Sequence, residues 1–128
     1  MSTDLTLLVW AVALTLVQGV IAVLGAQMQV GLPALAGNRE NLPPITGWAG
    51  RAARAHRNML ENLVLFAALV LVAHAAGKAN GVTILGSELF FWARLVYVPV
   101  FVIGIPWVRT GVWAVSVVGL VIIFIQLL

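Results

Sequence analysis

The sequence has 128 residues, of which 62% are hydrophobic and 9% are charged, and its mean hydropathy is +1.09. Soluble domains carry about 25% charged residues, so this composition indicates an integral membrane protein with a single domain, residues 1–128. The chain has no cysteine, which excludes disulfides, thiolate nucleophiles and thiolate metal sites. The net charge of +3 comes mostly from basic residues beside hydrophobic runs, which argues against a nucleic-acid partner.

Four hydrophobic segments predict an all-α bundle of four transmembrane helices. A span needs about 20 residues, and Leu5–Ala26 supplies 22 without a charge. Residues 1–4 lack the basic residue of a signal peptide, and the apolar run exceeds a signal core of about 7–15 residues, so we expect a retained helix. The expected helices are 5–26, 47–76, 87–105 and 110–128.

The segments between these helices contain helix breakers and polar residues. The longest connection, residues 31–46, contains two glycines and three prolines and is expected to interrupt the helical structure. Ser87 and Glu88 are expected to cap the third helix. Pro106 is expected to end that helix, which places Arg109 in the turn before the fourth.

Lysine and arginine are distributed unequally between the two ends of the helices. One end carries five arginines and the other carries only Lys78. The positive-inside rule then places the first connection and the third turn in the cytoplasm, with both termini on the non-cytoplasmic side. The five arginines are Arg39, Arg51, Arg54, Arg57 and Arg109.

Four polar residues of the second helix have spacings of 3, 4 and 3, which place them on one helix face. They are Arg51, Arg54, Asn58 and Glu61. The charge-free run that follows, Asn62–Gly77, has only 16 residues, so part of the charged turn must enter the membrane. Such charges are costly and indicate a functional site. Two alternatives stay open: Arg51 and Arg57 as snorkelling anchors, and a structural Arg54–Glu61 pair.

The third helix contains a second charge at the membrane. The charge-free run after Arg94 has 14 residues, so Arg94 lies within the membrane or at its edge. Tyr97 and Phe101 follow on the same helix face. The functional interpretation is that Arg94 and Tyr97 face the polar residues of the second helix. The alternative is an interfacial aromatic belt with a snorkelling arginine.

Several guanidiniums together with Glu61 suit a ligand that carries both anionic groups and an ammonium. Arginine pairs strongly with carboxylates through two parallel hydrogen bonds. A small peptide with two carboxylates and one amine fits this set, and so does a lipid phosphate, which needs no Glu61. The residues alone do not decide between these two ligands.

The segment Arg54-Ala-His-Arg-Asn58-Met-Leu-Glu61 resembles the Arg-x-x-x-Asn-x-x-Glu motif of the MAPEG family, the membrane-associated proteins in eicosanoid and glutathione metabolism. Residues 93–97 and 104–113 resemble the third helix of that family and the turn after it. The resemblance covers nearly the whole chain. We expect a bacterial-type member of the family, located in the bacterial inner membrane.

The resemblance implies a homotrimer that binds glutathione, as cosubstrate, between neighbouring subunits. It implies glutathione contacts from five residues and thiolate stabilisation by Arg109. The five are Arg54, Asn58, Glu61, Arg94 and Tyr97. Because Arg51 continues the same helix face, we expect it to hold a carboxylate of the ligand as well. The expected activity is that of a transferase or peroxidase, with a lipophilic electrophile or lipid arriving from the bilayer as the second substrate.

The sequence departs from the family pattern at two places. Phe101 stands where better-known members tend to have a second tyrosine, and Gln27 and Gln29 stand where many have basic residues. The alternative function is therefore a noncatalytic lipid-binding or scaffold member of the family. A third possibility is a small four-helix exporter, but such exporters commonly carry a carboxylate in the first helix, and Leu5–Ala26 has none.

Overall fold

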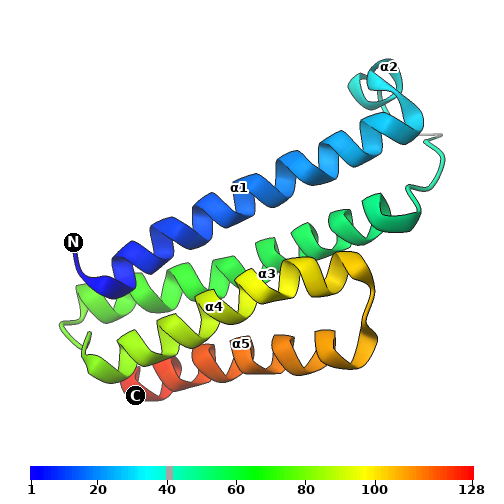
Figure 1. Ribbon diagram of the computed structural model, residues 1–128. Helices are drawn as coiled ribbons and strands as arrows, with labels where there is room; N and C mark the ends of the chain where they lie inside the picture. The colour runs from blue at the N-terminus through cyan, green and yellow to red at the C-terminus, as the bar shows by residue number, and fades with distance from the viewer. Residues whose placement is uncertain (40–41) are drawn as a thin grey trace.

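A computed structural model describes residues 1–39 and 42–128, which form a bundle of four long helices with one short extra helix (Figure 1). The helices are α1 (Thr3–Val30), α2 (Leu32–Ala36), α3 (Gly47–Ala75), α4 (Gly81–Ile103) and α5 (Pro106–Leu127). In these described residues the four long helices are each apolar enough to cross a membrane, and no strand is present. The expected all-α membrane fold is confirmed.

The third long helix begins at Gly81, six residues before the expected start at Ser87. Asn80 caps it: the side-chain oxygen accepts from the N–H groups of Val82 (2.9 Å) and Thr83 (3.1 Å), and the Asn80 N–H donates to the Thr83 hydroxyl at 2.9 Å. This reciprocal capping box satisfies backbone groups that a helix start leaves unpaired. Ser87 does not cap the helix; it is buried and donates to the Thr83 carbonyl at 2.8 Å.

Pro106 begins α5 rather than ending the helix before it. The preceding helix ends at Ile103 because Gly104 has a φ of 89°, in the left-handed region that glycine adopts without strain. Proline is tolerated in the first turn of a helix, where its missing N–H would have no partner. Arg109 therefore lies in the first turn of α5 and not in a loop. The short helix α2 likewise carries Pro33 in its first turn, inside a connection expected to be irregular.

The two most extensive helix pairs are α1 with α3 and α4 with α5. Contacts between α3 and α4, in the middle of the bundle, join the two pairs (Figure 1). Phe66 of α3 stacks on Phe90 of α4 with ring centroids 4.3 Å apart. These rings belong to the main apolar core, at the end that holds both chain termini. At the other end the buried apolar cluster is smaller and consists of Ala55, Tyr97 and Phe101.

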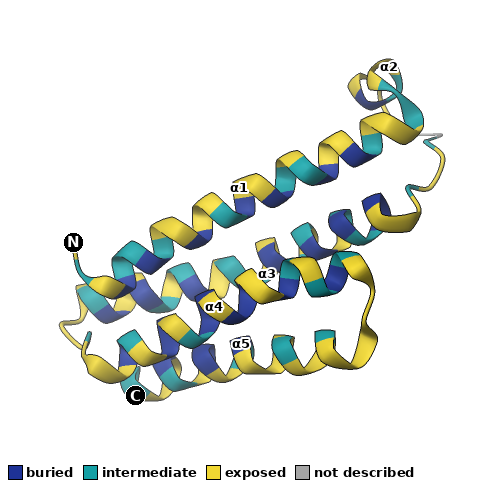
Figure 2. Cartoon of the chain, in the orientation of Figure 1, coloured by how far each residue is buried: buried dark blue, intermediate teal, exposed yellow. Residues whose placement is uncertain are grey.

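The outward faces of the helices are exposed, whereas the buried residues line the inward faces (Figure 2). Leucine, valine and tryptophan side chains dominate these exposed faces, with Leu16, Val64 and Trp107 among them. Such a surface suits lipid and not water, because large exposed apolar patches are rare on soluble monomers. The protein is therefore an integral membrane protein.

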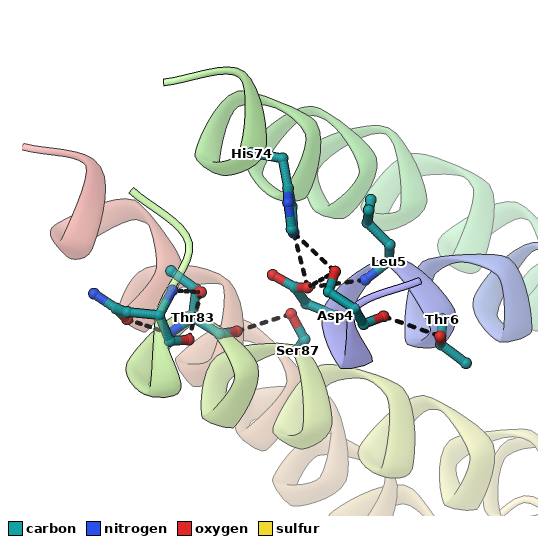
Figure 3. Close-up of polar contacts among 8 residues, drawn as sticks. Asp4, Leu5, Thr6, His74, Thr83 and Ser87 are labelled. Atoms are coloured by element: carbon teal, nitrogen blue, oxygen red, sulfur yellow. Dashed lines mark hydrogen bonds and ion pairs between the residues drawn. The ribbon is translucent and has the colours of Figure 1, made fainter. Parts of the chain in front are cut away.

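A polar contact ties the first turn of α1 to the last turn of α3, at the terminal end of the bundle (Figure 3). Asp4 is 1% exposed, and its Oδ1 lies 2.8 Å from Nε2 of His74. The same oxygen accepts from the Ser2 hydroxyl at 2.7 Å and from the Leu5 N–H at 3.0 Å. Because an ionised carboxylate only accepts, Nε2 of His74 carries the proton in this contact.

A close helix contact joins α4 and α5 at Gly86 and Gly119. A Cβ atom built on Gly119 would lie 2.5 Å from the Gly86 carbonyl oxygen and 2.8 Å from the Phe90 nitrogen, and both are backbone atoms. Small residues at membrane helix interfaces let the backbones approach closely. The α4–α5 pair therefore depends on the missing side chains at these two positions.

We expect Gly119→Ala to destabilise the protein by about 1–3 kcal/mol, because the added methyl group overlaps backbone atoms that cannot rotate away. The measurement is the melting temperature in detergent. Gly111→Ala is the matched control on the same helix, since a Cβ there meets nothing within 4 Å. The control should melt at the same temperature or higher, because alanine favours helix over glycine by about 1 kcal/mol. Equal melting of the two variants would contradict the packing argument.

Candidate functional site

The polar face of α3 lies at the end of the bundle opposite the chain termini. Arg54 and Glu61 are exposed on the protomer surface, and Asn58 is half-buried between them. Within residues 1–39 and 42–128 the ion pair that forms is Asp4–His74, so neither Arg54 nor Arg57 pairs with Glu61. The alternative of a structural Arg54–Glu61 pair is not realised in the described chain, and these charges stay available to a ligand or a neighbouring subunit.

Arg51 lies one turn before Arg54 and is half-buried against the end of α4. Its Nε donates to the Val102 carbonyl at 2.7 Å. The last carbonyls of a helix have no intrahelical donor, so this hydrogen bond supplies one and ties α3 to α4. Arg51 is thus positioned by the protein and is more than a flexible anchor for lipid headgroups.

Arg94 lies on the buried stripe of α4. Phe90, Arg94, Tyr97 and Phe101 are all buried and recur at helical spacing, so Arg94 points into the bundle. It is 1% exposed, and its Cζ lies 4.2 Å from the centroid of the Tyr97 ring. The alternative of a snorkelling arginine in an interfacial belt does not match this placement.

The guanidinium of Arg94 has no hydrogen-bond partner for any of its three nitrogens in the described part of the chain. The face of the Tyr97 ring offers a cation–π contact, but it accepts none of the five N–H groups in the plane of the guanidinium. A buried charge without a partner costs several kcal/mol, and proteins normally supply an anion. The Arg94 guanidinium is therefore a candidate binding group for an anionic ligand.

A small pocket of about 160 Å³ lies between α3, α4 and α5, and the Tyr97 ring on which Arg94 packs is part of its lining. Its lining residues are Asn58, Tyr97, Arg109, Thr110 and Trp113. The Arg109 guanidinium also lies over the Phe101 ring, with its Cζ 5.0 Å from the ring centroid. Phe101 lacks the expected hydroxyl but supports Arg109 through this cation–π contact.

The structure thus brings Asn58, Tyr97 and Arg109 into one pocket and stacks Arg94 on Tyr97. It places Arg54 and Glu61 on the open surface of α3, outside that pocket. Two pocket residues, Thr110 and Trp113, were not expected. Trp113 follows Arg109 by four residues, and residues four apart lie on the same face of a helix. This spacing predicts that Trp113 lies beside Arg109 only if Arg109 is itself helical, which requires α5 to begin at Pro106.

The arrangement suits a small anionic ligand that also carries hydrogen-bonding groups. Guanidiniums from three different helices lie at this end of the bundle, from Arg51 and Arg54 on α3, Arg94 on α4 and Arg109 on α5. The Asn58 amide and the Tyr97 hydroxyl add groups that orient a ligand, and Glu61 adds a carboxylate. No group of three or more potential metal ligands is present among the described residues.

One comparison with known proteins gives a match. The family model described as "MAPEG family" matches residues 5–128, nearly the whole chain. No curated protein and no solved structure matches. The match includes the Arg54–Glu61 motif and the residues around Arg94 and Arg109 on which the resemblance was based. The chain belongs to the MAPEG family.

Proposed function

We propose that this protein is a membrane-bound, glutathione-dependent transferase or peroxidase that acts on lipophilic electrophiles. The MAPEG family includes glutathione transferases and peroxidases. The observation that carries the proposal is the buried guanidinium of Arg94, which has no hydrogen-bond partner among the described residues and lies against a ring that lines the small pocket. A peptide carboxylate is a strong partner for such a group.

In this proposal the site residues hold the three charged groups of glutathione. Arg94, Arg54 and Arg51 bind its carboxylates, Glu61 binds its ammonium, and Asn58 and Tyr97 orient the peptide. Arg54 and Glu61 are exposed on the isolated protomer, so the ligand is not enclosed by one chain alone. This exposure supports a homotrimer in which a neighbouring subunit covers the α3 face and the glutathione lies between subunits.

The proposed role of Arg109 is to stabilise the glutathione thiolate. The chain has no cysteine, so the reactive sulfur comes from the cosubstrate. A thiol has a pKa near 8.5, and a cation close to the sulfur lowers it, so more of the thiol is ionised at neutral pH. Arg109 lines the small pocket and is the guanidinium among its described lining residues, which supports a role beside the sulfur.

The bound thiolate supports two reactions. In transfer, it forms a C–S bond with an electrophilic carbon, and the electron pair goes to the leaving group or to an atom that is then protonated. In peroxide reduction, it attacks a peroxide oxygen, the O–O bond breaks, the sulfur becomes a sulfenic acid, and the alkoxide takes up a proton and leaves as an alcohol. A second glutathione thiol then attacks the sulfenic sulfur, which forms the oxidised disulfide and releases water.

The proposed location is the bacterial inner membrane, with the arginine-rich end in the cytoplasm and both termini on the other side. The two termini lie at the same end of the bundle, and the α4–α5 turn lies at the opposite end (Figure 1). This arrangement agrees with the positive-inside rule. It also opens the candidate site toward the compartment that would supply glutathione.

A second candidate function is a noncatalytic, lipid-binding or scaffold role. Gln29 favours this role, because its side-chain amide is hydrogen-bonded within the protomer and is not free to contact a ligand. Its Nε2 donates to the Thr46 carbonyl at 2.7 Å, and its Oε1 accepts from the Thr46 N–H at 3.0 Å. Gln29 therefore fixes the start of α3 instead of supplying the basic contact found in many family members.

We expect glutathione to bind with a Kd of roughly 0.1–5 mM, a weak affinity set by salt-screened ion pairs. Titration calorimetry on the detergent-purified protein measures it. Arg94→Met should weaken binding at least tenfold while keeping or raising the melting temperature of the ligand-free protein, because it removes an unpaired buried charge. Arg57→Ala is the control that removes one exposed positive charge, and it should change affinity less than threefold. Absence of heat at 10 mM glutathione rejects the proposed enzyme.

Glu61→Gln should impair glutathione binding more than folding. Glu61 is exposed and has no ion-pair partner in the described residues, so its neutralisation leaves no buried charge unpaired. We expect a melting temperature within about 2 °C of the wild type, since surface substitutions usually change stability by less than about 0.5 kcal/mol. Affinity for glutathione should fall, while affinity for an analogue without the amino group should not change. Equal losses for both ligands would show that Glu61 does not bind the ammonium.

Arg109→Ala should lower turnover much more than glutathione affinity. A neutral thiol gains little from a nearby cation, whereas the thiolate gains much, so the loss appears in the ionised state. The pKa of the bound thiol, followed by ultraviolet thiolate absorbance, should rise in the variant, and its rate should recover as the pH rises. Lys78→Ala, at the opposite end of the bundle, should leave this pKa unchanged. An identical pKa in wild type and Arg109→Ala would exclude the proposed role.

A further inference from the structure

Glu88 lies two turns inside α4 and is exposed on the outward face of the bundle. Because α4 begins at Gly81, the expected role of Glu88 in capping this helix is wrong. The helix of 23 residues is about 35 Å long and the hydrocarbon core is about 30 Å thick, so a residue about 10 Å from the helix start lies inside the core. The Glu88 carboxylate therefore faces lipid at membrane depth and needs another explanation.

The protein itself supplies no cation for this carboxylate. Ionisable residues in membrane segments normally face the bundle interior and pair with one another, and glutamate lacks the long stem that lets lysine reach the headgroups. The basic side chains described at this end of the bundle are engaged, since His74 pairs with Asp4 and the Lys78 Nζ donates to the Leu127 carbonyl at 3.0 Å. A second copy of the chain offers the same engaged side chains, so the partner of Glu88 is a different molecule.

Glu88 lines a groove of about 410 Å³ between α4 and α5. The rest of its lining is apolar and includes Trp92, Val96 and Val115. Glu88, Trp92 and Val96 recur every four residues and so share one face of α4, over a length of about 12 Å. Because Glu88 is exposed and belongs to the lining, a molecule in the groove reaches the carboxylate. The volume is in the range of small-molecule sites, about 300–1,000 Å³.

We propose that this groove binds a lipophilic amine from the bilayer, a molecule with one ammonium group and an apolar body. The Glu88 carboxylate accepts charge-assisted hydrogen bonds from the ammonium. Trp92, one turn further along α4, adds an indole ring, which is the best aromatic partner for a cation. The apolar body lies along Val96 and Val115. A phosphatidylethanolamine headgroup fits less well, because its phosphate has no cation among the lining residues.

The groove is separate from the glutathione site. Its lining residues all belong to α4 and α5, whereas the proposed subunit contact covers α3, and none of the residues assigned to glutathione is among them. The groove extends to Val112, which packs against the cluster of Ala55, Tyr97 and Phe101. The inference therefore goes beyond the proposed function and is tested without glutathione.

Trp92 reports occupancy of the groove, because a bromine atom close to an indole ring quenches its fluorescence. The probes are 4-(4-bromophenyl)butan-1-amine, which is positively charged at about pH 7 as lysine is, and the matched neutral alcohol, 4-(4-bromophenyl)butan-1-ol. Each is added to the detergent-purified protein. We expect saturable quenching by the amine, which bromine-free 4-phenylbutan-1-amine reverses, and at least tenfold weaker quenching by the alcohol. A short-chain phosphatidylethanolamine should compete at least tenfold more weakly than 4-phenylbutan-1-amine.

Variants test the position of the bound amine and the role of the carboxylate. Trp92→Phe should lose most of the saturable quenching, whereas Trp107→Phe, at the opposite end of the bundle, should keep it. Glu88→Gln keeps the side-chain shape and removes the charge, so it should bind the amine at least tenfold more weakly and the alcohol unchanged. Glu88→Asp is the matched control that keeps the charge and should keep a preference for the amine. Val115→Phe keeps Glu88 and fills part of the groove, so it should weaken both probes.

Equal affinity of the wild type for the amine and the alcohol would overturn the proposal, and so would a preference for the amine that survives in Glu88→Gln. Saturable quenching that is unchanged in Trp92→Phe or in Val115→Phe would place the bound probe outside the groove and would also overturn it. Competition by the phosphatidylethanolamine as strong as by the amine would assign the groove to a lipid headgroup instead. Because Val115→Phe keeps the carboxylate, it gives an independent answer if Glu88→Gln does not fold.

Discussion

Close approach of helices is the constraint on which the rest of this structure depends. In a bilayer the hydrophobic effect does not drive helices together, because lipid tails are as apolar as leucine, so association relies on packing and polar contacts. The Gly86–Gly119 contact allows α4 and α5 to touch through their backbones. Gly25 has the same role between α1 and α3, since a Cβ there would lie 2.7 Å from the Cβ of Ala49. With these pairs fixed, the Phe66–Phe90 stack joins the two halves.

The bundle is packed unevenly along its length, and the candidate site lies at the less tightly filled end. The main apolar core lies toward the termini, whereas the buried cluster described at the arginine-rich end is small and consists of Ala55, Tyr97 and Phe101. At that end arginine, asparagine and tyrosine occupy positions that apolar residues could fill, so less apolar surface is packed there. Real proteins accept such local costs where function requires them, and the guanidinium of Arg94, which has no hydrogen-bond partner among the described residues, is one such cost.

Much of the fold follows from the sequence, because the bilayer fixes the length of a spanning helix. The length of the charge-free runs and the 3-4-3 spacing on α3 led to the four spans, the polar face and the importance of Arg94. The ends of helices were predicted less well. Asn80 caps α4 through hydrogen bonds that a search for apolar runs does not detect, and Pro106 starts a helix as readily as it ends one.

Long-range contacts between polar residues were not predictable from spacing at all. The Asp4–His74 contact and the groove beside Glu88 depend on which helices lie side by side and in what rotation. A sequence pattern shows which residues share one face of one helix, but the partner of that face is decided by the packing of the whole bundle. The candidate site residues on α3, α4 and α5 were proposed from their types, whereas the grouping of Asn58, Tyr97 and Arg109 into one pocket required the structure.

The Asp4–His74 contact also sets an order in which the bundle is assembled. Its two residues are separated by 70 positions, so α1 leaves the ribosome long before the last turn of α3 exists. Until then the Asp4 carboxylate keeps its hydration at the membrane surface, because burial without a partner is too costly. The docking of the first turn of α1 is therefore a late event, which follows the insertion of α3. By contrast, α4 and α5 are adjacent in sequence and can pair as soon as both have crossed the membrane.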